Sequence, residues 1–208
     1  MNKGIEPYFI VKEGASAEIK IKGSRFIAEA FPVSTALEAE AILADVKKKG
    51  YDATHHCSAY KIGADGLIFR YSDDGEPNSS AGLPIFRQIE GHEFTNVLVV
   101  VTRYYGGTKL GTGGLVRAYG DAAGLALDAS SREEVIPRTE VVIEFDYDDT
   151  SPAMHTVSQF DVVVRDTHYT ELTRMHLDVR TSEVEQFIAL FVEALSGRGS
   201  CALLGDNE

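Results

Sequence analysis

The order of strand and helix signals over residues 140–204 constrains the fold of this chain more than any other feature. Two helix signals, at residues 151–160 and 182–197, separate stretches with the alternating or β-rich character that is typical of strands. The expected strands cover residues 140–147, 162–169, 172–179 and 201–204. Their order, β-α-β-β-α-β, predicts a ferredoxin-like sandwich, an architecture that hosts many unrelated functions.

Both helices of this region carry start signals. Ser151 is a good N-cap residue, and Pro152 then occupies the first helical position, where proline is favoured. Ser182 and Glu185 have the spacing of a capping box, and Gly197 is a stop signal. We therefore expect the two helices to begin directly after Ser151 and Ser182.

Residues 1–137 are expected to form a separate domain, so that the whole chain is α+β. The run Val97–Val101 is continuously apolar and mostly β-branched, which predicts a strand buried on both faces. The polar stretch 130–137 ends a helical segment, so we place the boundary after Pro137, giving domains 1–137 and 138–208. Further strands are predicted at residues 8–11, 18–22, 26–33, 55–62 and 67–71, and helices at residues 36–49, 85–89 and 115–128.

The charge of the chain argues against a general nucleic-acid binder, because 20 Lys+Arg and 32 Asp+Glu give a net charge of −12. This charge is unevenly divided, since a cut after Pro137 leaves −3 in the first part and −9 in the second. The acidic residues of the second part lie mostly at polar positions of its pattern, and a solvated face explains them better than a metal cluster does.

Composition also narrows the class of protein. The two cysteines, Cys57 and Cys201, lie far apart and indicate neither a disulfide framework nor a zinc motif. No apolar run approaches the ~20 residues of a membrane helix. Residues 1–7 are not followed by the apolar stretch of a secretion signal. We expect a cytoplasmic protein that does not contact a membrane and holds neither a metal nor a cofactor.

The segment Arg103–Arg117 contains five glycines, three basic residues and no acidic residue. It lies between the buried strand and a helix, so unpaired backbone N–H groups and the positive helix end can converge on an anion. It matches neither the Walker pattern nor the dinucleotide fingerprint, and its glycines could equally serve turns or close packing. The candidate phosphate-binding residues are Arg103, Tyr104, Gly106, Gly107, Lys109, Gly111, Gly113, Gly114 and Arg117.

A second candidate region is the stretch of residues 72–84, which has no apolar periodicity and is long for a loop in a compact domain. Asp73, Asp74 and Glu76 could hold magnesium or act as acid and base. Alternatively, Asp73-Asp74-Gly75 is a turn, with Asp73 paired to Arg70 or Arg103.

The pair His55 and Cys57 offers one more candidate site. These residues share one face of a predicted strand and could hold a metal together, while His56 faces the other way. A strand with one buried thiol is the simpler interpretation.

Several motifs together resemble one known family. The segments Asp52–Tyr60, Ser72–Pro77 and Arg103–Tyr119, with Lys22–Ala28, resemble the Impact family, specifically its YigZ-like bacterial members. The resemblance covers essentially the whole chain. It implies that the first domain has the fold of ribosomal protein S5 domain 2. It also implies that the second domain is similar to domain V of elongation factor G, and that the protein has a role in translation.

The chain departs from the family pattern after Pro77. The family tends to have Ser-Gly-Thr there, and then a lysine before Pro84. Asn78-Ser79-Ser80 and Leu83 stand in this chain instead, which leaves one cation fewer for a phosphate backbone.

Three functions are compatible with these features. The first is a binding protein of the translation apparatus that contacts RNA, the ribosome or a translation-related protein through the basic glycine-rich loop. The second is an enzyme acting on a phosphorylated small molecule or nucleotide. The third is a protein–protein regulator without a small ligand. We prefer the first, because the three cations of the loop have no acidic neighbour in an acidic chain.

Overall fold

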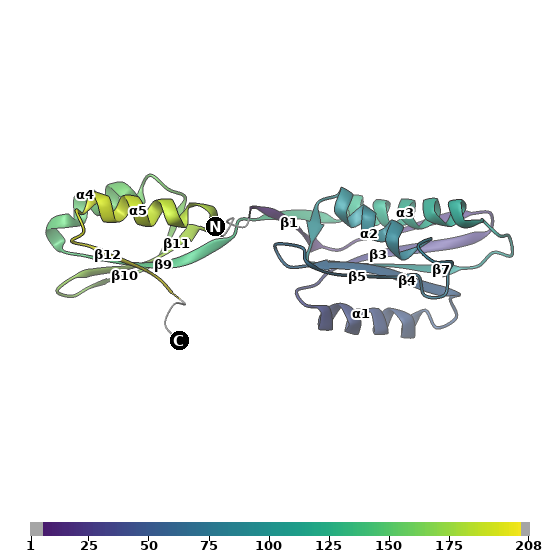
Figure 1. Ribbon diagram of the computed structural model, residues 1–208. Coiled ribbons are helices and arrows are strands. Elements are labelled where there is room, and N and C mark those ends of the chain that lie inside the picture. Colours follow the sequence, from purple (N-terminus) through teal and green to yellow (C-terminus); the bar gives the residue numbers. More distant parts are fainter. Residues whose placement is uncertain (1–5, 205–208) are drawn as a thin grey trace. The chain divides into compact units, whose positions relative to one another are not determined.

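In the computed structural model, which describes residues 6–204, the chain forms two compact units, residues 8–135 and a second unit that begins at Ile136. Both units combine helices with strands (Figure 1), which confirms the predicted α+β class. Among the described residues, no helix is long and apolar enough to cross a bilayer.

The first unit is built on two sheets and the helices that cover them. Its elements are β1 (Tyr8–Glu13), β2 (Ser16–Ile21), β3 (Ser24–Pro32), α1 (Ala36–Lys49), β4 (His55–Ile62), β5 (Ile68–Ser72), α2 (Gly82–Gly91), β6 (Phe94–Thr95), β7 (Val97–Tyr104), α3 (Thr112–Ala129) and β8 (Ser131–Val135). The larger sheet has the strand order β2-β3-β7-β4-β5, and the smaller one β6-β1-β8. Helix α1 lies on one face of the larger sheet, and α2 and α3 lie on the other (Figure 1).

Strand β7 is the central strand of the larger sheet and pairs antiparallel with both β3 and β4. All five residues of Val97–Val101 are fully buried, as predicted for a strand covered on both faces. Val97, Val99 and Val101 belong to the hydrophobic core beneath α2 and α3. Leu98 and Val100 belong to the core beneath α1. Because successive side chains of a strand point to opposite faces of the sheet, β7 contributes to both cores.

The predicted start of α1 is confirmed, because the Thr35 hydroxyl accepts a hydrogen bond from the Glu38 N–H at 3.1 Å. Helix α3 begins at Thr112, three residues before the predicted start. Gly113 and Gly114 have low helix propensity, so the sequence pattern does not predict that this first turn is helical. The Leu115 N–H nevertheless donates to the Gly111 carbonyl at 2.9 Å, so the turn is closed.

The structure corrects the interpretation of the polar stretch before Pro137, where the sequence predicts no strand. Its residues Ser131–Val135 form β8, which pairs antiparallel with β1 inside the first unit. The sequence predicts no strand here, because the side chains of this stretch are polar. Its pairing comes from the backbone, and the Arg132 guanidinium lies 3.5 Å from the ring centroid of Phe9. The two-domain division at Pro137 stays a prediction, with the first compact unit ending at Val135.

The second unit has the predicted order β-α-β-β-α-β. Its elements are β9 (Arg138–Phe145), the 3₁₀ turn η1 (Tyr147–Asp149), α4 (Thr150–Val157), β10 (Val162–Tyr169), β11 (Thr173–Arg180), the 3₁₀ turn η2 (Thr181–Glu183), α5 (Val184–Ala194) and β12 (Ser200–Leu203). The strands pair antiparallel in the order β10-β11-β9-β12. This arrangement is the split βαβ pattern expected from the sequence.

The predicted start signals of α4 and α5 are wrong. The N-cap of α4 is Asp149, not Ser151, and the carboxylate of Asp149 binds Arg198 (Nη2–Oδ1 2.7 Å) instead of the helix end. The N-cap of α5 is Glu183, and it makes no side-chain cap. A 3₁₀ turn leads into each helix and replaces the expected cap. The stop at Gly197 is confirmed, since this residue has φ 76° and its N–H donates to the Val192 carbonyl at 2.9 Å.

Because Leu98 is fully buried beneath α1, we expect Leu98→Ala to lower the free energy of unfolding of the first unit by about 2–5 kcal/mol. Leu37→Ala is the matched control, since the Leu37 side chain on α1 is 82% exposed, and it should change stability by less than about 0.5 kcal/mol. Urea denaturation followed by tyrosine fluorescence measures both. Equal shifts for the two variants would contradict the assignment of β7 to the centre of the core.

Candidate anion-binding site

The candidate site lies in the first unit, where the start of β4, the loop after β5, the end of β7 and the N-terminus of α3 meet. A cavity of about 490 Å³ opens there. Its lining residues are Thr54, His55, Glu76, Pro77, Arg103, Tyr105, Lys109, Leu110, Gly111, Thr112 and Leu115. The structure thus brings His55 and Glu76 together with the basic glycine-rich segment, although they are far apart in the sequence.

Asp73 holds the loop after β5 in place through backbone hydrogen bonds. Its Oδ1 accepts from the N–H groups of Ala81 and Gly82, both at 2.9 Å, and its Oδ2 accepts from the Ser79 N–H at 2.8 Å. The predicted turn role of Asp73 agrees with these contacts. Its predicted pairing with Arg70 or Arg103 is wrong, because Arg70 binds Glu40 and Arg103 binds Glu76. A carboxylate that satisfies three backbone donors leaves the loop little freedom.

Asp74 ties the same loop to α1 and β4. Its Oδ1 lies 2.7 Å from the Lys47 ammonium, and its Oδ2 accepts from the His56 N–H at 2.7 Å. Burial alone would raise the pKa of Asp74, but the hydrogen bond and charge of Lys47 and the His56 N–H outweigh burial and lower it below 3.8. The sequence pattern missed this role of Lys47, because a lysine at a helix end is adequately explained by the helix dipole.

Glu76 forms a buried polar centre. Its side chain is 4% exposed and pairs with the guanidinium of Arg103, which is 6% exposed. The Tyr119 hydroxyl donates to Glu76 Oε1 at 2.7 Å, and His55 Nε2 lies 3.9 Å from the same oxygen. Burial raises the pKa of Tyr119, and the neighbouring Cys57 and Glu76 raise it further, so the phenol stays a proton donor.

The guanidinium of Arg103 is engaged inside the protein. Besides Glu76, it donates to the Ser24 hydroxyl from Nη2 at 3.3 Å, and it lies 5.3 Å from the Phe26 ring centroid. Its Nε is buried and makes no hydrogen bond in the described structure. Of the three cations in the glycine-rich segment, Arg103 therefore serves first as the partner of Glu76. Ser24 and Tyr119 were not singled out as site residues, although both belong to the motifs that carry the family resemblance.

Lys109 and Arg117 are the two cations of this segment that remain exposed. Within the part of the chain that the structure describes, neither side chain makes an ion pair or a hydrogen bond. Lys109 precedes the first turn of α3, which contains no acidic residue and has no side-chain cap. The two cations and the free N–H groups of this turn are therefore the part of the segment that can receive an anion.

The tyrosines and glycines of the segment play different roles. Tyr104 is covered by Arg25, whose guanidinium lies 4.4 Å from its ring centroid, whereas Tyr105 is 45% exposed. Gly106 packs on Gly23 so closely that a Cβ would lie 1.9 Å from the Gly23 carbonyl carbon. Gly107 and Gly111 have φ of 86° and 71°, a turn conformation that favours glycine. Gly113 and Gly114 lie in the first turn of α3.

The histidines and Cys57 do not form a metal site with the loop carboxylates. Among residues 6–204, no three His, Cys, Asp or Glu side chains gather in a metal-binding arrangement. His55 and Cys57 share one face of β4, as predicted, and contact the carbonyls of Asp74 and Asp73 in the loop. His56 faces α1 and contacts the Gly50 carbonyl at 3.0 Å. Burial raises the pKa of the Cys57 thiol to about 12, so the thiol is protonated at neutral pH.

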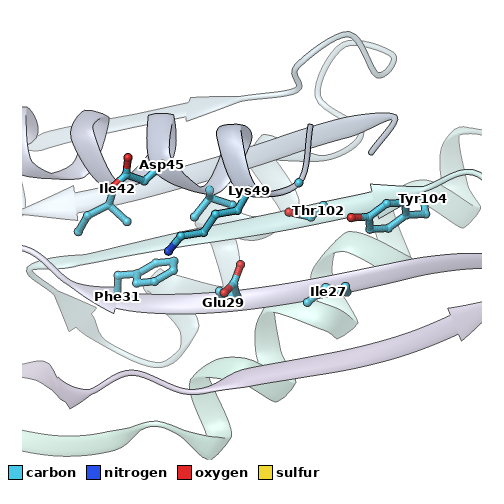
Figure 2. Close-up of a pocket in the computed structure, with 10 residues that line it drawn as sticks. Ile27, Glu29, Phe31, Ile42, Asp45, Lys49, Thr102 and Tyr104 are labelled. Atoms are coloured by element: carbon cyan, nitrogen blue, oxygen red, sulfur yellow. The ribbon is translucent and has the colours of Figure 1, made fainter. Parts of the chain in front are cut away.

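A second hollow, of about 450 Å³, lies on the α1 face of the larger sheet. Figure 2 shows Asp45 and Lys49 on α1, and Glu29 and Phe31 on β3, around this hollow. Two carboxylates against one ammonium give it a net negative charge, which disfavours a phosphate. Of the two hollows, the one beside α3 is the better anion site.

The fold and the site define an α+β protein in which a buried central strand leads, through a basic glycine-rich segment, into a helix with an open N-terminus. The family model described as the Impact N-terminal domain matches residues 22–127, and that of a domain of unknown function, DUF1949, matches residues 143–198. The chain belongs to the IMPACT family.

Two family members and one solved structure show what the chain is similar to. IMPACT family member YvyE of Bacillus subtilis (strain 168) is 34% identical over 93% of this chain and 89% of its own length. IMPACT family member YigZ of Escherichia coli (strain K12) is 32% identical over 98% of this chain and 100% of its own length. A solved structure titled "Crystal structure of an hypothetical protein" has a TM-score of 0.66 at 30% identity and covers 97% of this chain and 99% of its own.

Glu76→Gln should destabilise the first unit by about 3–5 kcal/mol, because it leaves the buried Arg103 charge without its carboxylate. Glu40→Gln is the matched control. It breaks the exposed ion pair with Arg70 and should lower the free energy of unfolding by less than about 1 kcal/mol. Urea denaturation of both variants tests the difference, and a small effect at Glu76 would mean that the buried pair does not stabilise this site.

Asp74 should make stability depend on pH. Its pKa is lower in the folded state, so its stabilising contribution is present above the unfolded-state value and disappears as pH falls through the folded-state pKa, below 3.8. We expect Asp74→Asn to be less stable than the parent at pH 6, and we expect this difference to disappear as pH falls through the folded-state pKa of Asp74. Denaturation curves across this range are the measurement. A difference that grows on acidification would contradict the role of Lys47 as the partner of Asp74.

Proposed function

We propose that this protein is a cytoplasmic, translation-associated RNA-binding protein that holds RNA phosphates at the N-terminal end of α3. The observation that carries the proposal is the exposure of Lys109, just before an uncapped helix start, and of Arg117 in the second turn of the same helix, both without internal partners in the described structure. Phosphate oxygens are the anions that backbone N–H groups and a helix dipole receive best. The role in translation follows from the family resemblance, as does the choice of RNA or the ribosome as partner.

The fold resemblances support the same proposal. We infer that the first domain has the fold of ribosomal protein S5 domain 2 and that the second resembles domain V of elongation factor G. Both of these proteins belong to the translation apparatus. The exposed ring of Tyr105, which lies in the same segment as the two cations, adds a stacking surface of the kind that single-stranded RNA uses.

The uneven distribution of charge along the chain is compatible with selective binding of RNA. The net charge of −12 disfavours non-specific binding of RNA, whereas the segment Arg103–Arg117 contains no acidic side chain. Since Arg103 is paired internally, two cations and one helix end remain for phosphate contacts. We therefore expect a small number of phosphate contacts and a modest dependence of affinity on salt.

Lys109→Ala with Arg117→Ala should weaken the binding of single-stranded RNA. Each lost phosphate contact removes about 0.7 from the slope of log K against log salt, so we expect the slope to become shallower by about 1.4. Fluorescence anisotropy with a labelled decauridylate at increasing salt measures this slope.

The matched control for this experiment is Lys48→Ala with Arg87→Ala. It removes the same charge from exposed positions on α1 and α2. The control should keep the parent slope. An equal decrease of the slope in both variants would show a general charge effect and overturn the assignment of Lys109 and Arg117 to the binding site. Capture of a defined protein partner that survives high salt, with no RNA binding, would favour the protein–protein alternative.

A further inference from the structure

We propose that the cavity beside α3 binds one unstacked nucleotide of a single-stranded RNA, with its base against Tyr105 and its phosphate at the start of α3. This inference rests on the proposed function and extends it from phosphate contacts to the reading of a base. The cavity of about 490 Å³ falls within the range of small-ligand sites, so one nucleotide is a suitable occupant.

The apolar part of the lining suits a base. Tyr105, Pro77, Leu110 and Leu115 line the cavity, and the Tyr105 ring is 45% exposed. The Arg103 guanidinium carbon lies 5.4 Å from the Tyr105 ring centroid, which restrains the ring on one side. An exposed aromatic ring beside apolar side chains is the surface on which unstacked bases pack in RNA-binding proteins.

The polar part of the lining can read the edge of that base. His55 Nδ1 lies 2.8 Å from the Asp74 carbonyl, which only accepts, so Nδ1 carries the proton. In the neutral ring, Nε2 is then an acceptor. It makes no hydrogen bond in the described structure and lies 3.9 Å from Glu76 Oε1. Arg103 also lines the cavity, with its side chain 94% buried and its Nε unpaired. A buried donor without a partner is costly, and a ligand that adjusts the wall of this cavity could satisfy it.

The charges of the lining suit one phosphate. Glu76 and Arg103 neutralise each other at the base of the site. Lys109 and the first turn of α3, which has no acidic residue, then leave a net positive charge. This charge matches the single negative charge of an internal RNA phosphate.

The test uses the full-length protein and two labelled strands, a decauridylate and a decamer of abasic ribose phosphates. These strands share a backbone and differ only in their bases. We expect the decauridylate to bind the parent protein about 10-fold more tightly, because stacking of one base contributes an amount of this size. Tyr105→Ala should abolish that preference, and Tyr105→Phe should retain it. Tyr147→Ala, at a tyrosine of the second unit that is 82% exposed, is the matched control and should leave the preference unchanged.

The outcomes separate the cavity from the proposed function. If both strands bind the parent equally, with affinity that still depends on Lys109 and Arg117, the cavity proposal is overturned and RNA binding stands. If neither strand binds, both proposals fail. If uridine monophosphate binds in a Tyr105-dependent manner while the decauridylate does not bind, the cavity is a binding site for free nucleotides, and the RNA proposal is overturned.

Discussion

The buried ion pair between Glu76 and Arg103 is the interaction on which the candidate site depends. It joins the loop after β5 to the end of β7, and Tyr119 and Ser24 connect the same centre to α3 and β3. Two charges in a largely water-free position are stable only while both are present and hydrogen-bonded. The pair, with Tyr119, therefore fixes the loop, the central strand and α3 relative to one another. It also explains why the cations open to a ligand are Lys109 and Arg117.

The position of β7 gives this centre a rigid base. Its first five residues are buried on both faces, and its last two, Arg103 and Tyr104, carry the strand to the edge of the core. The chain then turns through Gly106, which packs directly on Gly23, and enters α3. The glycine-rich segment is thus held at both ends by regular secondary structure, an arrangement in which a binding site can be both accessible and well positioned.

Secondary structure was largely predictable from the sequence, and each error has a physical cause. Strands with clear alternation and the Thr35 cap of α1 were predicted correctly, because their signals are local. The starts of α4 and α5 were wrong, because 3₁₀ turns precede both helices and no short motif announces such turns. β8 was missed since its side chains are polar and its stability comes from pairing with β1, more than a hundred residues earlier.

The sequence by itself determined the α+β class, the β-α-β-β-α-β order of the second unit and the basic glycine-rich segment as the place to look for a ligand. These features depend on periodicity and composition, which neighbouring residues carry. Only the tertiary structure decided the partner of each charge. It paired Arg103 with Glu76 and Lys47 with Asp74, and it left Lys109 free of internal partners within the described residues. Pairing of charges depends on distances between segments remote in the chain, and no local pattern encodes those distances.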